Sequence, residues 1–147
     1  MVVDIVSRFD FERSLFAGRR ERELSIGELN RLMLTAQAVT YGDALANDER
    51  HPYMWAVKGH YYSSDLSYYN YPYLFGLLFG LGLYAIYRNE AATFPERYDA
   101  LLASTGRASA ADLAARFDID LHDPGFWRSS LAVIRDDIDR LEELAVG

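Results

Sequence analysis

Apolar residues recur at every third or fourth position along most of this sequence, which is the spacing of one helix face. The seam near the C-terminus alternates steps of four and three and contains Trp127, Leu131, Ile134, Ile138, Leu141 and Ala145. Another stripe contains Leu29, Leu32, Met33, Ala36 and Val39. No run shows the strict alternation of apolar and polar side chains that a half-buried strand requires. The pattern therefore predicts an all-α chain of about six helices.

Start signals place these helices along the chain. The capping-box spacing S/T-x-x-D/E occurs in the pairs Ser25 and Glu28, Thr93 and Glu96, and Ser109 and Asp112. The first helix is expected over residues 2 to about 20. Pro72 is expected to open a third helix that ends near Asn89, and Asp123–Pro124 to open the last one. The seam from Trp127 to Leu141 is expected to pack against the other helices.

Length, charge and cysteine content limit the classes of protein. A chain of 147 residues is expected to form a single helical domain, 1–147, with a core of its own. Its net charge of −7 argues against a nucleic-acid partner, because phosphate binding needs clustered Lys and Arg. The absence of cysteine excludes disulfides and thiolate metal sites. The N-terminal residues do not have the pattern of a secretory signal, so a cytoplasmic location is expected.

The segment Leu66–Tyr87 contains 22 residues without a charge. Its continuous apolar part, Leu74–Tyr87, covers only about 14 residues, which is short for a bilayer. The segment therefore predicts the most buried helix of a core, with no membrane span. Gly76 and Gly80 have the GxxxG spacing that lets another helix approach closely.

Tyrosines crowd the region from His51 to Tyr87, where nine of the eleven are found. Seven of them lie between Tyr53 and Tyr73, on both sides of His60. Every buried tyrosine hydroxyl needs a hydrogen-bond partner, so an ordinary core uses aliphatic residues instead. The cluster is interpreted either as a wall of phenolic donors facing a polar ligand or as a buried aromatic cluster with satisfied hydroxyls.

Other chemical motifs are weak. His51 and His60 are nine residues apart with Pro52 between them, so they do not share a helix face as i, i+4 metal ligands do. His122 precedes the last predicted helix and is assigned a local contact. The sequence contains no GxSxG and no glycine-rich phosphate loop. No metal site is expected on this chain alone.

Several blocks resemble, in order, the C-terminal part of the catalytic domain of the oligoendopeptidase F and thimet oligopeptidase family of zinc metallopeptidases. They are IVSRFDFE, ELSIGELNRLMLTAQAVTYGD, HPYMWAVKGHYYS, YYNYPYLFGLLFGLGLYAIY, YDALLASTGRASAADLAARFDIDL and DPGFWRSSLAVI. In that family an earlier helix bearing HExxH binds the zinc, and this chain has no HExxH. The resemblance implies the substrate-binding and transition-state-stabilising part of a zincin-type metalloendopeptidase acting on oligopeptides. This part would be inactive until a complementary HExxH-containing half supplies the zinc.

The resemblance also implies roles for individual residues. His60 would donate to the oxyanion of the tetrahedral intermediate together with Tyr68 and Tyr71, which share the three-residue spacing of the family's tyrosine pair. Tyr69 is the alternative donor. The residues expected to bind substrate are Trp55, Tyr61, Tyr62 and Tyr69.

The first predicted helix begins at Val2 with no capping residue before it, which suggests a part of a larger catalytic unit. Such a part would expose an apolar face, and self-association through that face is the alternative to a complementary half. Two other interpretations stay open: a helical module that binds a peptide or protein without catalysis, and a small membrane-associated protein.

Overall fold

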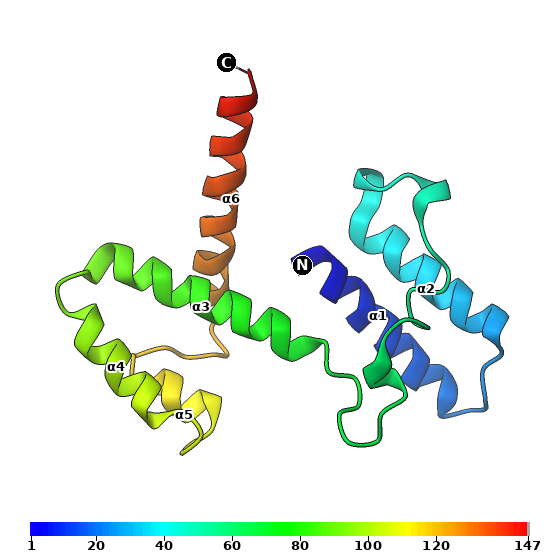
Figure 1. Ribbon diagram of the computed structural model, residues 1–147, viewed down its shortest axis with the longest axis horizontal. Helices are drawn as coiled ribbons and strands as arrows, with labels where there is room; N and C mark the ends of the chain where they lie inside the picture. The colour runs from blue at the N-terminus through cyan, green and yellow to red at the C-terminus, as the bar shows by residue number, and fades with distance from the viewer. Residues whose placement is uncertain (147) are drawn as a thin grey trace. The chain divides into compact units, whose positions relative to one another are not determined.

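The computed structural model describes residues 1–146 and is all-α, as the sequence predicted (Figure 1). The described residues form six α-helices and no strand. The helices are α1 (Val2–Arg19), α2 (Ile26–Tyr41), α3 (Tyr71–Glu90), α4 (Phe94–Ser104), α5 (Ala110–Ala115) and α6 (Pro124–Val146). Three single 3-10 turns lie between α2 and α3, namely η1 (Gly42–Ala44), η2 (Asn47–Glu49) and η3 (Gly59–Tyr61).

The chain divides into two compact units, unit 1 (Met1–Phe75) and unit 2 (Gly76–Gly147), with the boundary inside α3. Each unit has its own hydrophobic cluster of buried side chains. The units are therefore described separately, and the single domain expected from the length stays a prediction.

In unit 1, α1 and α2 lie side by side and enclose a small core (Figure 1). Its buried members are Phe11 and Leu15 of α1 and Met33 and Ala36 of α2. The predicted capping box of Ser25 and Glu28 is present at the start of α2, where each side chain bonds the other residue's backbone N–H. This cap satisfies the first free N–H groups of the helix.

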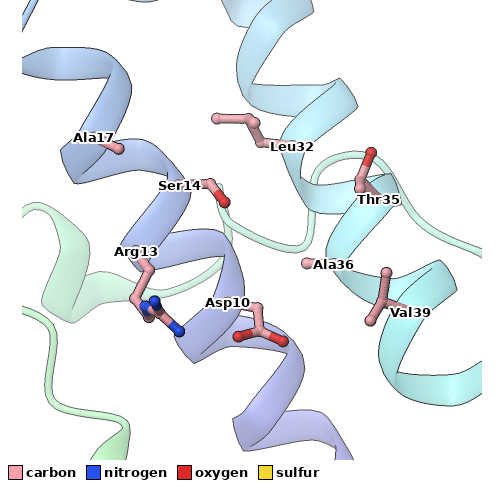
Figure 2. A pocket seen from close by; sticks show the side chains of 8 residues that line it. All are labelled: Asp10, Arg13, Ser14, Ala17, Leu32, Thr35, Ala36 and Val39. Atoms are coloured by element: carbon pink, nitrogen blue, oxygen red, sulfur yellow. The ribbon is translucent and has the colours of Figure 1, made fainter.

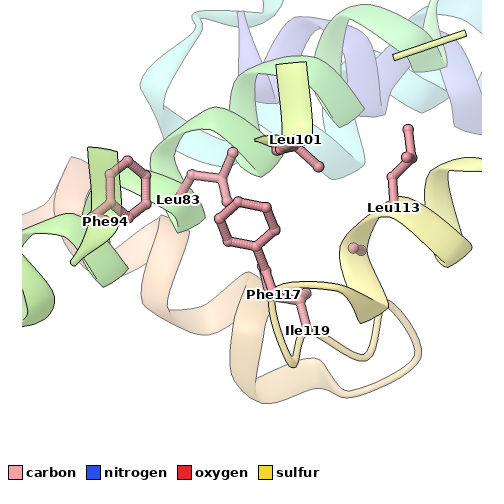
Figure 3. Packing of buried hydrophobic residues seen from close by; sticks show 7 residues of the cluster. Leu83, Phe94, Leu101, Leu113, Phe117 and Ile119 are labelled. Atoms are coloured by element: carbon pink, nitrogen blue, oxygen red, sulfur yellow. The ribbon is translucent and has the colours of Figure 1, made fainter. Parts of the chain in front are cut away.

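In unit 2, the end of α3 packs with α4, α5 and the turn after α5. Figure 3 shows the core side chains converging from these elements, among them Leu83, Phe94, Leu101, Leu113, Phe117 and Ile119. Ser109 caps α5 as predicted, because its hydroxyl accepts from the N–H of Asp112 at 3.2 Å. The predicted box at Thr93 is wrong. Thr93 has helical backbone angles and makes no side-chain cap bond, since a capping residue normally needs an extended backbone.

The expectation that Leu74–Tyr87 is the most buried segment is wrong. Only Gly82 and Leu83 of α3 are buried, while Phe79 and Ile86 are partly buried against the same cluster. These four positions form one i, i+3, i+4, i+7 stripe, so α3 packs through a single face although its sequence is apolar on all sides. None of the described helices combines the length and the apolar content that crossing a bilayer requires.

The close approach of another helix to α3 does not occur at Gly76 or Gly80, where it was expected. A Cβ built at Gly76 or Gly80 has no heavy atom of another described residue within 4 Å, apart from the adjacent residues and the backbone of α3 itself. A Cβ built at Gly82 would instead clash with the ring of Phe126 and come within 2.9 Å of the Ser130 hydroxyl. Gly82 is therefore the residue that lets α3 contact α6.

The face of α6 that packs on unit 2 also differs from the expected seam. Ser130 and Val133 are buried, whereas Leu131 is 42 %, Ile138 49 % and Leu141 65 % exposed. Phe126 and Ser130 face α3 at Gly82, and the buried Val133 lies on the same side of α6, a face that we call the Phe126–Ser130–Val133 face. The predicted seam lies next to this face, and Leu131, Ile138 and Leu141 of the seam stay exposed.

We expect Gly82→Ala to lower the free energy of unfolding by about 1 kcal/mol, measured by urea denaturation. Overpacking against Phe126 costs about 1–3 kcal/mol, and replacing a helical glycine returns about 1 kcal/mol. Gly80→Ala in the same helix is the matched control, and it should be stabilising because its Cβ meets nothing. Equal effects of the two changes would contradict the close contact.

Candidate functional site

The candidate site is built on the connection between α2 and α3 in unit 1. His60 lies in η3, before α3, where the sequence placed it. Two buried amides hold the ends of the connection. Gln37 of α2 donates to the carbonyl of His51 at 2.9 Å and accepts from its N–H at 3.0 Å. Asn70, immediately before α3, is only 2 % exposed and is hydrogen-bonded to α1.

The network around Asn70 is a feature that the sequence analysis missed. The Asn70 amide N–H₂ donates to a carboxylate oxygen of Glu12 and to the Tyr61 hydroxyl oxygen, the second at 3.1 Å. The Asn70 carbonyl oxygen accepts from the Arg8 guanidinium at 3.3 Å, and Arg8 also pairs with Asp4 at 2.5 Å. Asp4, Arg8 and Glu12 are four residues apart, which places them on one helix face. This charged stripe could have signalled a network, although such stripes usually face solvent.

The His60 side chain fixes the loop that follows it. Its Nδ1 accepts from the N–H of Tyr69 at 3.2 Å, and its backbone carbonyl accepts from the N–H of Tyr68 at 3.1 Å. A neutral imidazole that accepts at Nδ1 carries its proton on Nε2. The remaining donor of His60 is therefore the Nε2–H.

Tyr68 has a left-handed backbone with φ of 55°. This conformation is rare for a bulky residue and costs about 1–3 kcal/mol, so the surrounding structure must hold it in place. The bond to His60 does so, together with ring contacts to Phe16 at 4.6 Å and Tyr61 at 5.2 Å between centroids. In this conformation the Tyr68 ring lies against Phe16 of α1 and against Tyr61.

The Tyr68 ring forms one wall of a pocket of about 270 Å³ in unit 1. The pocket is lined mainly by aromatic and aliphatic side chains, namely Phe11, Leu15, Leu24, Ile26, Leu29, Trp55, Tyr61, Tyr62 and Tyr68, with Arg19 and Glu23 also contributing. Trp55 is held in place because its indole N–H donates to the side-chain oxygen of Asn30 at 2.9 Å. We call this the aromatic pocket.

The structure brings four of the seven sequence-predicted residues into the aromatic pocket: Trp55, Tyr61, Tyr62 and Tyr68. His60 is not in its wall but packs its ring edge-on against Tyr61, with centroids 4.7 Å apart. Tyr69 points its ring at Tyr73, and Tyr71 is 65 % exposed as the first residue of α3. Because Tyr68 precedes the helix, the three-residue spacing to Tyr71 does not place the two rings on one helix face.

A second hollow lies between α1 and α2 and encloses about 430 Å³ (Figure 2). Figure 2 shows Leu32 of α2 pointing toward Ser14 of α1, and Asp10 and Arg13 of α1 also line the hollow. Most of its other lining residues have short side chains, and no set of titratable groups converges there. This hollow offers contact surface but no evident chemistry.

The residues described by the structure do not include a group of three or more His, Asp or Glu side chains placed to hold a metal ion. The histidines His51 and His60 both use Nδ1 to accept a backbone N–H, from Tyr53 and Tyr69 respectively. The chemistry that the candidate site can supply is therefore hydrogen-bond donation and apolar binding.

Comparison with known proteins identified no relative: no family model, no curated protein and no solved structure matches this chain.

Burial raises the pKa of the Tyr61 hydroxyl above its usual value near 10, and the hydrogen bond and negative charge of Glu12 raise it further. Asn70 and Arg8 lower it to a smaller extent. Tyr61 therefore stays a neutral donor in the folded chain at a pH where the unfolded chain would ionise it.

We expect the free energy of unfolding to fall as the pH rises above about 10. The unfolded state then loses the Tyr61 proton while the folded state keeps it, which gives a slope of up to about 1.4 kcal/mol per pH unit. Tyr61→Phe should reduce this slope in urea titrations at several alkaline pH values. The exposed neighbour, changed as Tyr62→Phe, controls for the loss of a phenol from the same turn. An unchanged slope in Tyr61→Phe would contradict the assignment.

We also expect the isolated chain to bind no stoichiometric zinc, measured by metal analysis after equilibrium dialysis. Structural zinc sites use about four ligands and catalytic sites about three protein ligands, which the described residues do not assemble. Zinc held at one equivalent by two or more side chains of this sequence would overturn the expectation.

Proposed function

We propose that this chain forms the peptide-binding and oxyanion-stabilising side of a zinc metalloendopeptidase of the oligoendopeptidase F type. The observation that carries the proposal is the aromatic pocket, which lies beside the loop that His60 holds through Tyr68 and Tyr69. The sequence blocks that resemble this family support the same assignment. The substrate would be an oligopeptide.

The aromatic pocket suits one apolar side chain of a peptide. Its volume of about 270 Å³ lies below the roughly 300–1,000 Å³ of sites for drug-sized ligands. Aromatic walls provide large contact area, and a tyrosine at the rim can also bond a peptide backbone group. Among the described residues, the hydroxyls of Tyr62 and Tyr68 have no hydrogen-bond partner within the chain, whereas Tyr61 bonds to Glu12 and Asn70. Tyr62 and Tyr68 are therefore the donors left for a ligand.

In this proposal His60 and Tyr68 act as hydrogen-bond donors to the developing oxyanion. The hydrogen bonds within the loop do not use the His60 Nε2–H or the Tyr68 hydroxyl, so both can donate to a ligand. Donors of this kind contribute most when they are held in place before the charge develops. The bond from the Tyr69 N–H to His60 and the left-handed backbone of Tyr68 supply that fixed geometry. The resemblance pairs Tyr71 with Tyr68 as donors and gives Tyr69 as the alternative, so both residues are included in the test.

The residues present do not fit a zinc site, so no step through zinc is assigned to this chain. In the proposed enzyme the zinc would come with an HExxH-containing half. The aromatic pocket also favours a second candidate function, a helical module that binds peptides through this pocket without catalysis. The two candidates share the binding step and differ in whether a complementary half yields activity.

Both candidates can be tested with an equimolar mixture of this chain and a candidate HExxH-bearing half, using fluorogenic peptides. Activity of the mixture, with none from either chain alone, is expected. His60→Ala and Tyr68→Phe should each lower kcat by about 100–1,000-fold with a smaller change in KM, because the lost bond forms mainly in the transition state. Trp55→Ala should mainly raise KM, since it removes a pocket wall.

The controls separate the candidates. Tyr69→Phe and Tyr71→Phe show whether another tyrosine is the donor, and Tyr73→Phe is an exposed phenol with no assigned role. Peptide binding that depends on Trp55, with no activity in any mixture, would support the interaction module. Full kcat in both His60→Ala and Tyr68→Phe would exclude the catalytic assignment.

A further inference from the structure

The C-terminal half of α6 presents an apolar seam that nothing in unit 2 covers. Every residue from 135 to 145 is exposed, and Figure 1 shows no other element of unit 2 beside the last turns of the helix. Within this stretch Ile138 is 49 %, Leu141 65 % and Leu144 72 % exposed. Such residues on consecutive helix turns form a patch that normally marks a protein contact.

The spacing of the seam identifies the kind of contact. Its steps of three and four from Leu131 to Ala145 are those of the a and d positions of a coiled coil. Leu131, Ile138 and Ala145 take position a, and Ile134 and Leu141 take position d. The exposed face of α6 therefore has the pattern that packs against a similar helix.

We propose that α6 pairs with α6 of a second copy of this chain in an antiparallel two-helix coiled coil. Ile138 of one copy would pack against Leu141 of the other, and Ile134 against Ala145. This register places the whole contact in residues 134–145. It leaves the Phe126–Ser130–Val133 face on α3 undisturbed.

The charges beside the seam select this orientation. Arg135 and Glu142 both occupy position e, which faces position e of the partner in an antiparallel pair. The register above brings Arg135 of each copy next to Glu142 of the other, which gives two opposite-charge pairs. In a parallel pair, Glu142 would instead face Asp137 at position g, a like-charge contact. Net repulsion therefore disfavours the parallel alternative.

The contact is short, about three helix turns, so we expect an association that depends on concentration rather than a permanent dimer. Sedimentation velocity of the full chain should show monomers at low micromolar concentration and dimers at near-millimolar concentration. Ile138→Glu and Leu141→Glu should each weaken dimerisation by at least about tenfold, because a charge enters the seam. Leu102→Glu on α4, which is 52 % exposed, is the matched control and should not change it.

Charge reversal tests the register without touching the apolar seam. Arg135→Glu and Glu142→Arg should each weaken the dimer by about threefold to tenfold, and the double variant should restore it. In a parallel dimer Glu142→Arg would strengthen association, so that result would overturn the orientation. Circular dichroism of each variant shows whether the helix is retained.

Cross-linking provides an independent readout, because the chain has no cysteine. The double variant Ile134→Cys/Ala145→Cys should form an interchain disulfide on oxidation, whereas Ala145→Cys alone should not. A cross-link in Ala145→Cys alone would indicate a parallel pair. A chain that stays monomeric at every concentration, with Ile138→Glu lowering its stability, would show that the seam is covered within one molecule and would overturn the proposal.

Discussion

The side-chain amide of Asn70 joins α1 to the loop that carries His60 and Tyr68, since it donates to Glu12 and Tyr61 and accepts from Arg8. Removing it would leave the buried Glu12 carboxylate without that donor, and losing a hydrogen bond to a charged group typically costs about 1.5–3 kcal/mol. The amide of Gln37 has a parallel role at His51, the other end of the connection. The aromatic pocket therefore depends on polar bonds behind its wall as much as on the rings that form it.

The sequence predicted the helices where local signals decide the structure. Ser25 and Ser109 cap their helices because a capping interaction involves residues only three apart. Packing faces were predicted less well, because they depend on which helix comes near. Gly82 rather than Gly76 or Gly80 is the contact with α6, and this choice follows from the position of Phe126, which no local pattern reveals. The apolar seam of α6 lies on one helix, as its spacing predicted, but the prediction that it packs in the core is wrong, because Leu131, Ile138 and Leu141 are exposed.

For the candidate site, the crowding of tyrosines indicated the connection between α2 and α3, and the resemblance named Trp55, Tyr61, Tyr62 and Tyr68, which line one pocket there. Their roles stay a prediction. Crowding and resemblance were not enough to find the network of Arg8, Glu12 and Asn70, since charged residues at i, i+4 spacing are usually solvated. The left-handed backbone at Tyr68 was also out of reach, because a tyrosine does not signal this conformation as a glycine does. With this backbone conformation Tyr68 is not part of α3, so it does not share a helix face with Tyr71, the residue that the three-residue spacing had paired with it.

Because the backbone at Tyr68 is left-handed, selection for stability and selection for the pocket favour different amino acids at position 68. Gly, and to a lesser degree Asn, adopt a left-handed backbone with little strain, so pressure for stability alone would replace the tyrosine. Pressure to keep an aromatic wall or a phenolic donor in the pocket would retain it despite the strain. Among natural variants of this chain, the amino acid at this one position would distinguish lineages that still use the pocket from lineages that keep only the scaffold.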